Sequence, residues 1–181
     1  MSFHNVDFAN LKVSKMRGPQ NKRFGQVTMG NTKDKLEFQI PGSKLIFEPN
    51  EYNSISVDVN DEDFISFLEA LESFLSAELG ITERIDMGLR LPEDERFLPT
   101  FRIKLGDETG YYDEHEKRCD KDHVLKKKNM IHVLLQLHCT YQIDNRLGVS
   151  WKARQIRKGP DEPESPPKSP PAEEEEYQFL D

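Results

Sequence analysis

Residues 131–156 read IHVLLQLHCTYQIDNRLGVSWKARQI, and this stretch decides the fold. Apolar side chains occupy alternate positions over residues 131–141, with mostly polar residues between them, and the alternation resumes over residues 149–153. A period of two is typical of a strand with one face on a core and one face free. Because Asp144-Asn145 offers a turn between the two runs, the stretch predicts a long C-terminal hairpin.

Three shorter runs upstream alternate in the same way. They cover residues 36–40, 55–59 and 101–105, and each predicts a further half-buried strand. In the last of them Phe101, Ile103 and Leu105 share one face, which leaves the two basic residues between them on the other.

One helix is predicted between the second and third of these strands. Apolar residues from Phe64 to Leu75 fall at spacings of three and four, which is typical of a helix lying on a sheet. Asn60 or Asp61 can cap its start, and Gly80 can end it. The other helix face carries four acids that we expect to be simply solvated: Glu62, Glu69, Glu72 and Glu78.

Several strands, one helix between strand groups and a closing hairpin together predict a mainly β protein. The order of these elements fits an OB-fold-like β-barrel with one α-helix. A β-sandwich with one helix would give much the same pattern.

Composition divides the chain after residue 159. Six of the eleven prolines lie within residues 160–171, and a run of glutamates follows at 173–176. Proline removes backbone donors, and a block of like charges cannot pack on itself. We therefore expect a folded domain over residues 1–159, and a disordered Pro-rich spacer with an acidic tail over residues 160–181.

Charge is unevenly placed along the 181 residues, so the net charge of -8 is misleading. Residues 1–47 sum to +5, residues 48–116 to -14, residues 117–159 to +8 and residues 160–181 to -7. Two basic segments therefore flank an acidic middle. That arrangement is compatible with a polyanionic ligand even though the whole chain is acidic.

Several function classes lack their signatures. No apolar run is long enough for a membrane span, and the N-terminal residues lack the basic start and apolar run of a signal peptide. Two cysteines are too few for a disulfide framework, which favours an intracellular setting. Phosphate-loop, dinucleotide, zincin and serine-hydrolase motifs are missing, so we expect neither an enzyme nor a cofactor.

A zinc site is a weaker alternative. His115, Cys119 and His123 lie four residues apart and would share one face of a helix, with His138 or Cys139 completing the ligand set. The segment around them is nearly all charged, however, and is typical of a loop. We therefore expect unrelated surface residues and no metal.

The basic segments contain the elements of a single-strand groove. Cations neutralise phosphates, and aromatic side chains stack on unpaired bases. Trp151 shares its strand face with apolar neighbours, so we expect it in the core. The candidate DNA-binding residues are Lys12, Lys15, Arg17, Lys22, Arg23, Phe24, Lys33, Arg102, Lys104, Tyr111, Tyr112, Lys126, Lys127, Lys128, Lys152 and Arg154.

Two stretches and the tail together resemble the viral single-stranded DNA-binding proteins with an OB fold, found in large eukaryotic DNA viruses and short-tailed phages. The first stretch, LIFEPNEY at 45–52, leads through a strand to the predicted helix; the second is LGVSWKARQI at 147–156. The acidic tail is the third element. Here the usual final aromatic, Phe179, is followed by two further residues, and the spacer with Ser165 and Ser169 before prolines departs from the general pattern.

The resemblance implies a sequence-nonspecific single-stranded DNA-binding domain over residues 1–159 that acts in replication, recombination and repair of viral DNA. It also implies protein partners such as the DNA polymerase. From its charge of -7 we expect the tethered tail to compete with DNA and, when displaced, to recruit such a partner, and a homodimer stays open. We would then expect the protein to be located inside the host cell, where the viral DNA is replicated. A protein-interaction scaffold with an acidic tail is the alternative. The partner-binding tail residues are Glu173, Glu174, Glu175, Glu176, Tyr177 and Phe179.

Overall fold

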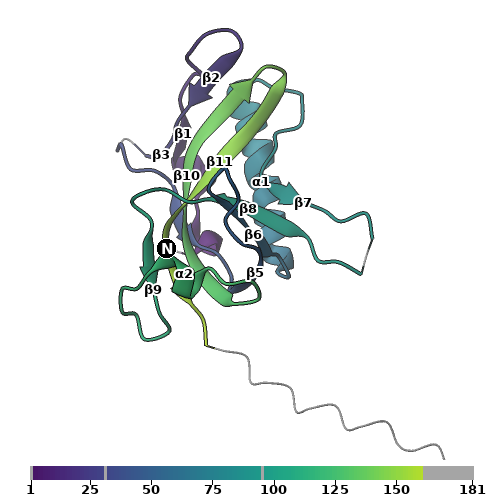
Figure 1. Cartoon of the computed structure of the whole chain (residues 1–181). Helices are drawn as coiled ribbons and strands as arrows, with labels where there is room; N and C mark the ends of the chain where they lie inside the picture. The colour runs from purple at the N-terminus through teal and green to yellow at the C-terminus, as the bar shows by residue number, and fades with distance from the viewer. Residues whose placement is uncertain (1, 31, 95, 161–181) are drawn as a thin grey trace, which may run out of the picture.

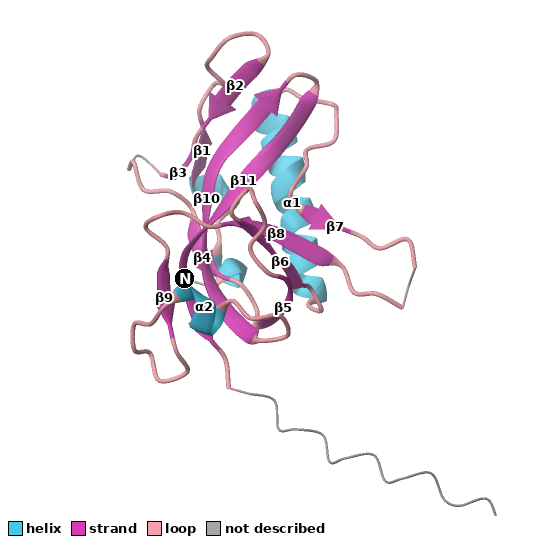
Figure 2. Cartoon of the chain, in the orientation of Figure 1, coloured by secondary structure: helices cyan, strands magenta, loops and turns pink. Residues whose placement is uncertain are grey.

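The computed structural model describes residues 2–30, 32–94 and 96–160, and the whole predicted acidic tail with its spacer after Pro160 lies outside them. Long strands dominate, and one long helix lies along them (Figures 1 and 2). The strands are β1 (Leu11–Val13), β2 (Lys22–Gly25), β3 (Val27–Met29), β4 (Glu37–Gln39), β5 (Ser43–Phe47), β6 (Ser54–Asp58), β7 (Leu89–Arg90), β8 (Thr100–Lys104), β9 (Gly110–Tyr112), β10 (Met130–Ile143) and β11 (Arg146–Lys158). The helices are α1 (Glu62–Leu79), α2 (Lys121–Val124) and two 3-10 turns, η1 (Phe3–Asn5) and η2 (Phe8–Asn10).

Five of the strands close into a barrel. β5 pairs with β6, β6 with β8, β8 with β11, β11 with β10, and β10 returns to β5. All of these pairings are antiparallel except that of β8 with β11, where Lys104 lies opposite Lys152. A closed ring confirms the predicted β-barrel with one main helix between strand groups and excludes the sandwich.

The long hairpin is confirmed, with a turn at Asp144, whose φ is 52°. One detail of its pattern is wrong in the sequence-based account. The register shifts between Leu137 and Cys139, and from there the inward position passes to Thr140, which is buried, while Tyr141 faces outward. An extra residue in one strand exchanges the two faces, and a side-chain alternation read from sequence cannot reveal where that happens.

Helix α1 is confirmed at both ends. The carboxylate of Asp61 accepts a hydrogen bond from the backbone N–H of Phe64 at 2.8 Å, and Gly80 ends the helix with φ of 65°. A side-chain cap and a left-handed glycine satisfy groups that the helix itself leaves unpaired. Phe64, Leu68, Leu71 and Leu75 are buried, so each contributes about 1.5–3 kcal/mol through removal of its apolar surface from water.

Trp151 lies in the core, as predicted. It is 1% exposed, and its indole Nε1 donates a hydrogen bond to the carbonyl oxygen of Met87. Phe38 meets its ring edge-on at 5.8 Å, and Phe101 packs at the same centroid distance. Within the residues that the structure describes, no helix is both long and apolar enough to cross a membrane.

Candidate nucleic-acid interface

A groove of about 1870 Å³ opens along one side of the barrel. One wall is the outward face of the β10–β11 hairpin together with β2 and residues 14–17. This wall continues into the segment 84–91, where the backbone of Asp86 hydrogen-bonds to Leu147 and Val149 of β11, and part of α1, β8 and the β5–β6 loop also line the groove. Strands β6 and β8 are the second and third of the barrel, and in OB-type barrels this face and the adjoining loops bind oligonucleotides.

Basic side chains predominate in this groove. They are Lys15, Arg17, Lys35, Arg84, Arg90, Arg102, Lys104 and Arg146. The acids that line it are Glu69, Glu72 and Asp86. Eight cations against three carboxylates give the lining an excess of positive charge, which attracts a polyanion.

Two of these carboxylates are already engaged within the protein. Asp86 forms an ion pair of 3.2 Å with Arg102 and accepts a hydrogen bond from the backbone N–H of Gly88. Glu72 accepts one from the backbone N–H of Ile85 at 2.9 Å, so it fixes the start of the wall segment. The expectation that the acids of α1 are simply solvated is therefore wrong for Glu72, which has a partner 13 residues away in sequence.

Three aromatic side chains face the same groove. Tyr52 is 74% exposed on the β5–β6 loop, and Phe24 is 42% exposed on β2. Tyr141 extends over Gly148, so closely that a Cβ at this glycine would overlap the tyrosine hydroxyl oxygen. Burial raises the pKa of Tyr141, with Asp86 adding to the effect, so its hydroxyl stays protonated at neutral pH. Exposed rings of this kind can stack on unpaired bases.

The structure brings together only some of the residues predicted from sequence. Lys15, Arg17, Phe24, Arg102 and Lys104 line the groove. The others do not line it: Lys12, Lys22, Arg23, Lys33, Tyr111, Tyr112, Lys126, Lys127, Lys128, Lys152 and Arg154. The DNA-binding role of either set stays a prediction.

The residues outside the groove lie in several places. Lys126, Lys127 and Lys128 form the turn between α2 and β10, near the lower end of the barrel in Figure 1, where the N–H of Lys128 donates to the carbonyl of Leu45 at 2.8 Å. Tyr111 and Tyr112 belong to β9, which pairs with β11 beyond the barrel. The side chain of Tyr111 is partly buried against the core, and this burial raises its pKa.

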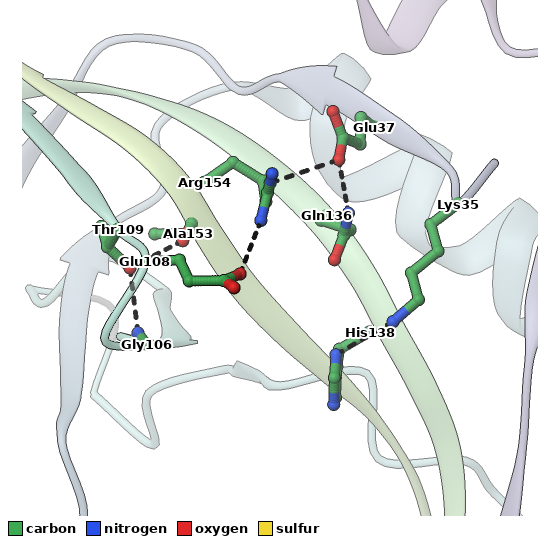
Figure 3. A network of polar contacts seen from close by, with 9 residues as sticks. All are labelled: Lys35, Glu37, Gly106, Glu108, Thr109, Gln136, His138, Ala153 and Arg154. Atoms are coloured by element: carbon green, nitrogen blue, oxygen red, sulfur yellow. Dashed lines mark hydrogen bonds and ion pairs between the residues drawn. The ribbon is translucent and has the colours of Figure 1, made fainter.

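Arg154 is held by two carboxylates, as Figure 3 shows. Its guanidinium lies 3.5 Å from Glu37 and 3.2 Å from Glu108, and Glu37 also accepts a hydrogen bond from Gln136. These partners fix the side chain on the outer face of the hairpin. The side chain of Lys152 lies across Gly106, so close that a Cβ at this glycine would overlap it.

Sequence reasoning missed several groove residues. Arg84 and Arg90 lie in the acidic stretch 48–116, where net charge concealed them. Tyr52 belongs to the quoted LIFEPNEY stretch but carried no separate signal. Tyr141 was assigned to the apolar face because the register shift after Leu137 is not visible in the sequence.

The histidine and cysteine residues considered for zinc do not converge. Among the described residues, no group of three or more His, Cys, Asp or Glu side chains could hold a metal ion. Burial raises the pKa of both thiols, Cys119 and Cys139, which disfavours the thiolate that zinc requires.

Solved structures with a similar fold exist, although no protein-family model and no curated protein matches the sequence. The single-stranded DNA-binding protein of bacteriophage Enc34, as a C-terminal truncation, aligns with a TM-score of 0.54 and 6% identity over 84% of this chain and 97% of that one. The same phage protein in complex with single-stranded DNA gives 0.54 and 5% identity over 85% and 99%. The single-stranded DNA-binding protein of bacteriophage T7 gives 0.47 and 13% over 81% and 100%. The two alignments with the Enc34 protein confirm, at the level of the fold, the resemblance to viral single-stranded DNA-binding proteins.

Proposed function

We propose that this protein binds single-stranded DNA without reading its sequence, in the groove defined above. One observation carries the proposal: eight basic side chains and three outward-facing aromatic rings line the same groove of the barrel. Support comes from the Enc34 protein, which shares the fold and has been solved in complex with single-stranded DNA.

The two kinds of side chain have different tasks in this mechanism. Lysine and arginine replace the counterions condensed on the phosphates, and their release makes binding stronger at low salt. The rings of Phe24, Tyr52 and Tyr141 stack on bases. Only an unpaired strand can stack in this way, because the bases of a duplex are already stacked and paired. Stacking accepts every base because each has an aromatic face, so affinity does not depend on sequence.

The tail has a separate part in the proposal. Residues 160–181 carry a charge of -7, and the 21 residues after Pro160 can span up to about 70 Å. That length allows the tail to reach the groove, where tethering raises its effective concentration to about millimolar. The tail then competes with weak ligands such as duplex DNA, and a bound single strand releases it.

We further propose a role in viral DNA replication, recombination and repair, which rests on the resemblance to viral single-stranded DNA-binding proteins. The released tail would present Tyr177 and Phe179 to a replication partner such as the DNA polymerase. Phosphorylation of Ser165 or Ser169 would add negative charge to the same segment. Binding rather than catalysis is the proposed activity, at the site of viral DNA replication.

A binding titration tests the proposal. Fluorescence anisotropy of labelled oligothymidylate should show binding whose logarithmic dependence on salt is linear and steep, with duplex of the same length bound more weakly. An affinity that does not change with salt, or equal affinity for duplex, would contradict it. No binding at any salt would leave the protein-interaction scaffold as the better account.

A further inference from the structure

Three lysines lie close enough to one histidine of the groove, His138, to interact with it electrostatically. The Nζ of Lys35 lies 3.2 Å from the Nδ1 of His138 on β10 (Figure 3). Lys104 on β8 lies opposite Lys152 on β11 in the only parallel pairing of the barrel strands, next to the same part of the hairpin. Lys35, Lys104 and His138 all line the groove, and His138 is exposed to it.

Burial and these lysines together disfavour protonation of the histidine. Burial lowers the pKa of His138 below its ordinary value, and the positive charges of Lys35, Lys152 and Lys104 lower it further. The ring is therefore neutral at neutral pH, with Nδ1 accepting a hydrogen bond from the Lys35 ammonium, which can only donate. Of the two carboxylates in Figure 3, Glu37 is engaged with Gln136 and Arg154, and Glu108 with Arg154.

We propose that Lys35, Lys104 and His138 form a binding site for one phosphate group of the strand, with Lys152 beside it, and that His138 takes up a proton when the phosphate binds. This inference rests on the proposed function. The phosphate draws the Lys35 ammonium away from Nδ1, and Nδ1 accepts a proton from the buffer. The resulting imidazolium then pairs with the phosphate oxygen.

Because of this site, the affinity for single-stranded DNA should be higher at lower pH. The negative phosphate raises the pKa of His138 in the complex, so binding takes up a proton between the lowered pKa of the unbound protein and the raised one of the complex. Affinity should therefore increase as pH falls through that window, which begins below the ordinary histidine value of about 6.5 and extends above it. The change is up to about tenfold per pH unit for one linked proton.

Isothermal titration calorimetry measures this proton uptake. The full chain is titrated with oligothymidylate at one pH in two buffers of different ionisation enthalpy. Wild type should take up a measurable fraction of a proton, at most about one, per bound oligonucleotide. His138→Gln should lose most of that uptake and still bind. His132→Gln is the matched control, because His132 is on the same strand, has a pKa also lowered by burial, and lies outside the groove.

The outcomes separate this inference from the proposed function. Loss of uptake in His138→Gln with retention in His132→Gln supports the phosphate site. Binding with equal uptake in wild type and His138→Gln overturns the site and leaves the proposed function standing. No binding by wild type overturns both. As a second readout, Lys35→Gln should raise the pKa of His138 in the unbound protein, measured by NMR, and an unchanged pKa would contradict the contact.

Discussion

The indole Nε1 of Trp151 donates a hydrogen bond of 2.7 Å to the carbonyl oxygen of Met87, 64 residues away in sequence. Both residues are buried, at 1% and 6% exposure. Through this bond the barrel strand β11 holds the segment that forms one wall of the groove. The buried tryptophan therefore positions the wall, and we expect that it does not stack on bases.

Replacement of Trp151 by phenylalanine should destabilise the fold. The Met87 carbonyl would lose its donor in a buried place, at a cost of about 1–3 kcal/mol in the free energy of unfolding. Urea denaturation followed by circular dichroism measures it. A variant as stable as wild type, with oligothymidylate binding abolished, would mean that the indole contacts the strand.

Two lysines that are close in sequence should differ in their effect on DNA binding. Lys35 lines the groove, and Lys33 does not. Lys35→Ala should therefore lower affinity and reduce the logarithmic salt slope by about 0.7–1, which corresponds to one phosphate contact. Lys33→Ala, with the same loss of net charge, is the control and should change the slope little. Equal effects in anisotropy titrations would show that only net charge matters.

Tyr52 should contribute through stacking. It is 74% exposed at the groove, and one base stacked on an aromatic ring is worth about 1–3 kcal/mol. Tyr52→Ala should weaken binding about 5- to 150-fold with little change in the salt slope. Tyr112→Ala, outside the groove, is the comparison. If Tyr112→Ala weakened binding more, without a loss of stability, the strand would follow β9 instead.

Removal of residues 160–181 should strengthen binding of both single-stranded and duplex DNA. The factor should be similar for both ligands, because a tethered competitor at the same site raises the apparent Kd of every ligand equally, and duplex, as the weaker ligand, is the one that falls below detection in the full chain. Competition titrations at low salt measure both affinities, and the difference should shrink as salt screens the charges. Unchanged affinities after truncation would remove the competition mechanism and leave the groove unaffected.

Local signals in the sequence predicted β4, β6, β8, the β10–β11 hairpin and helix α1 correctly, and they missed the shorter strands β1, β2, β3, β5, β7 and β9. The alternation around Phe101 and the cap at Asp61 depend on neighbours within a few residues, so they can be recognised in a linear chain. The face of Tyr141 could not be predicted, because it depends on an irregularity in the pairing of β10 with β11.

The groove itself depends on contacts between distant segments. Arg84 reaches the same groove as Lys15 because β11 and α1 hold the segment 84–91, through Met87 and Ile85. Arg154 shows the converse, since its strand position suggested a phosphate contact while Glu37 and Glu108 bind it instead. Charge in a segment predicts that a basic surface exists, and only tertiary pairing decides which cations share it.

Photo-crosslinking of the full chain to oligothymidylate, with the attachment sites identified by mass spectrometry, tests the central claim most directly. If a single strand occupies the groove, crosslinks should fall on Tyr52, Phe24 or Tyr141, whose rings face it. Crosslinks confined to Tyr111 and Tyr112, or to the turn at residues 126–128, would place the strand elsewhere and contradict the account.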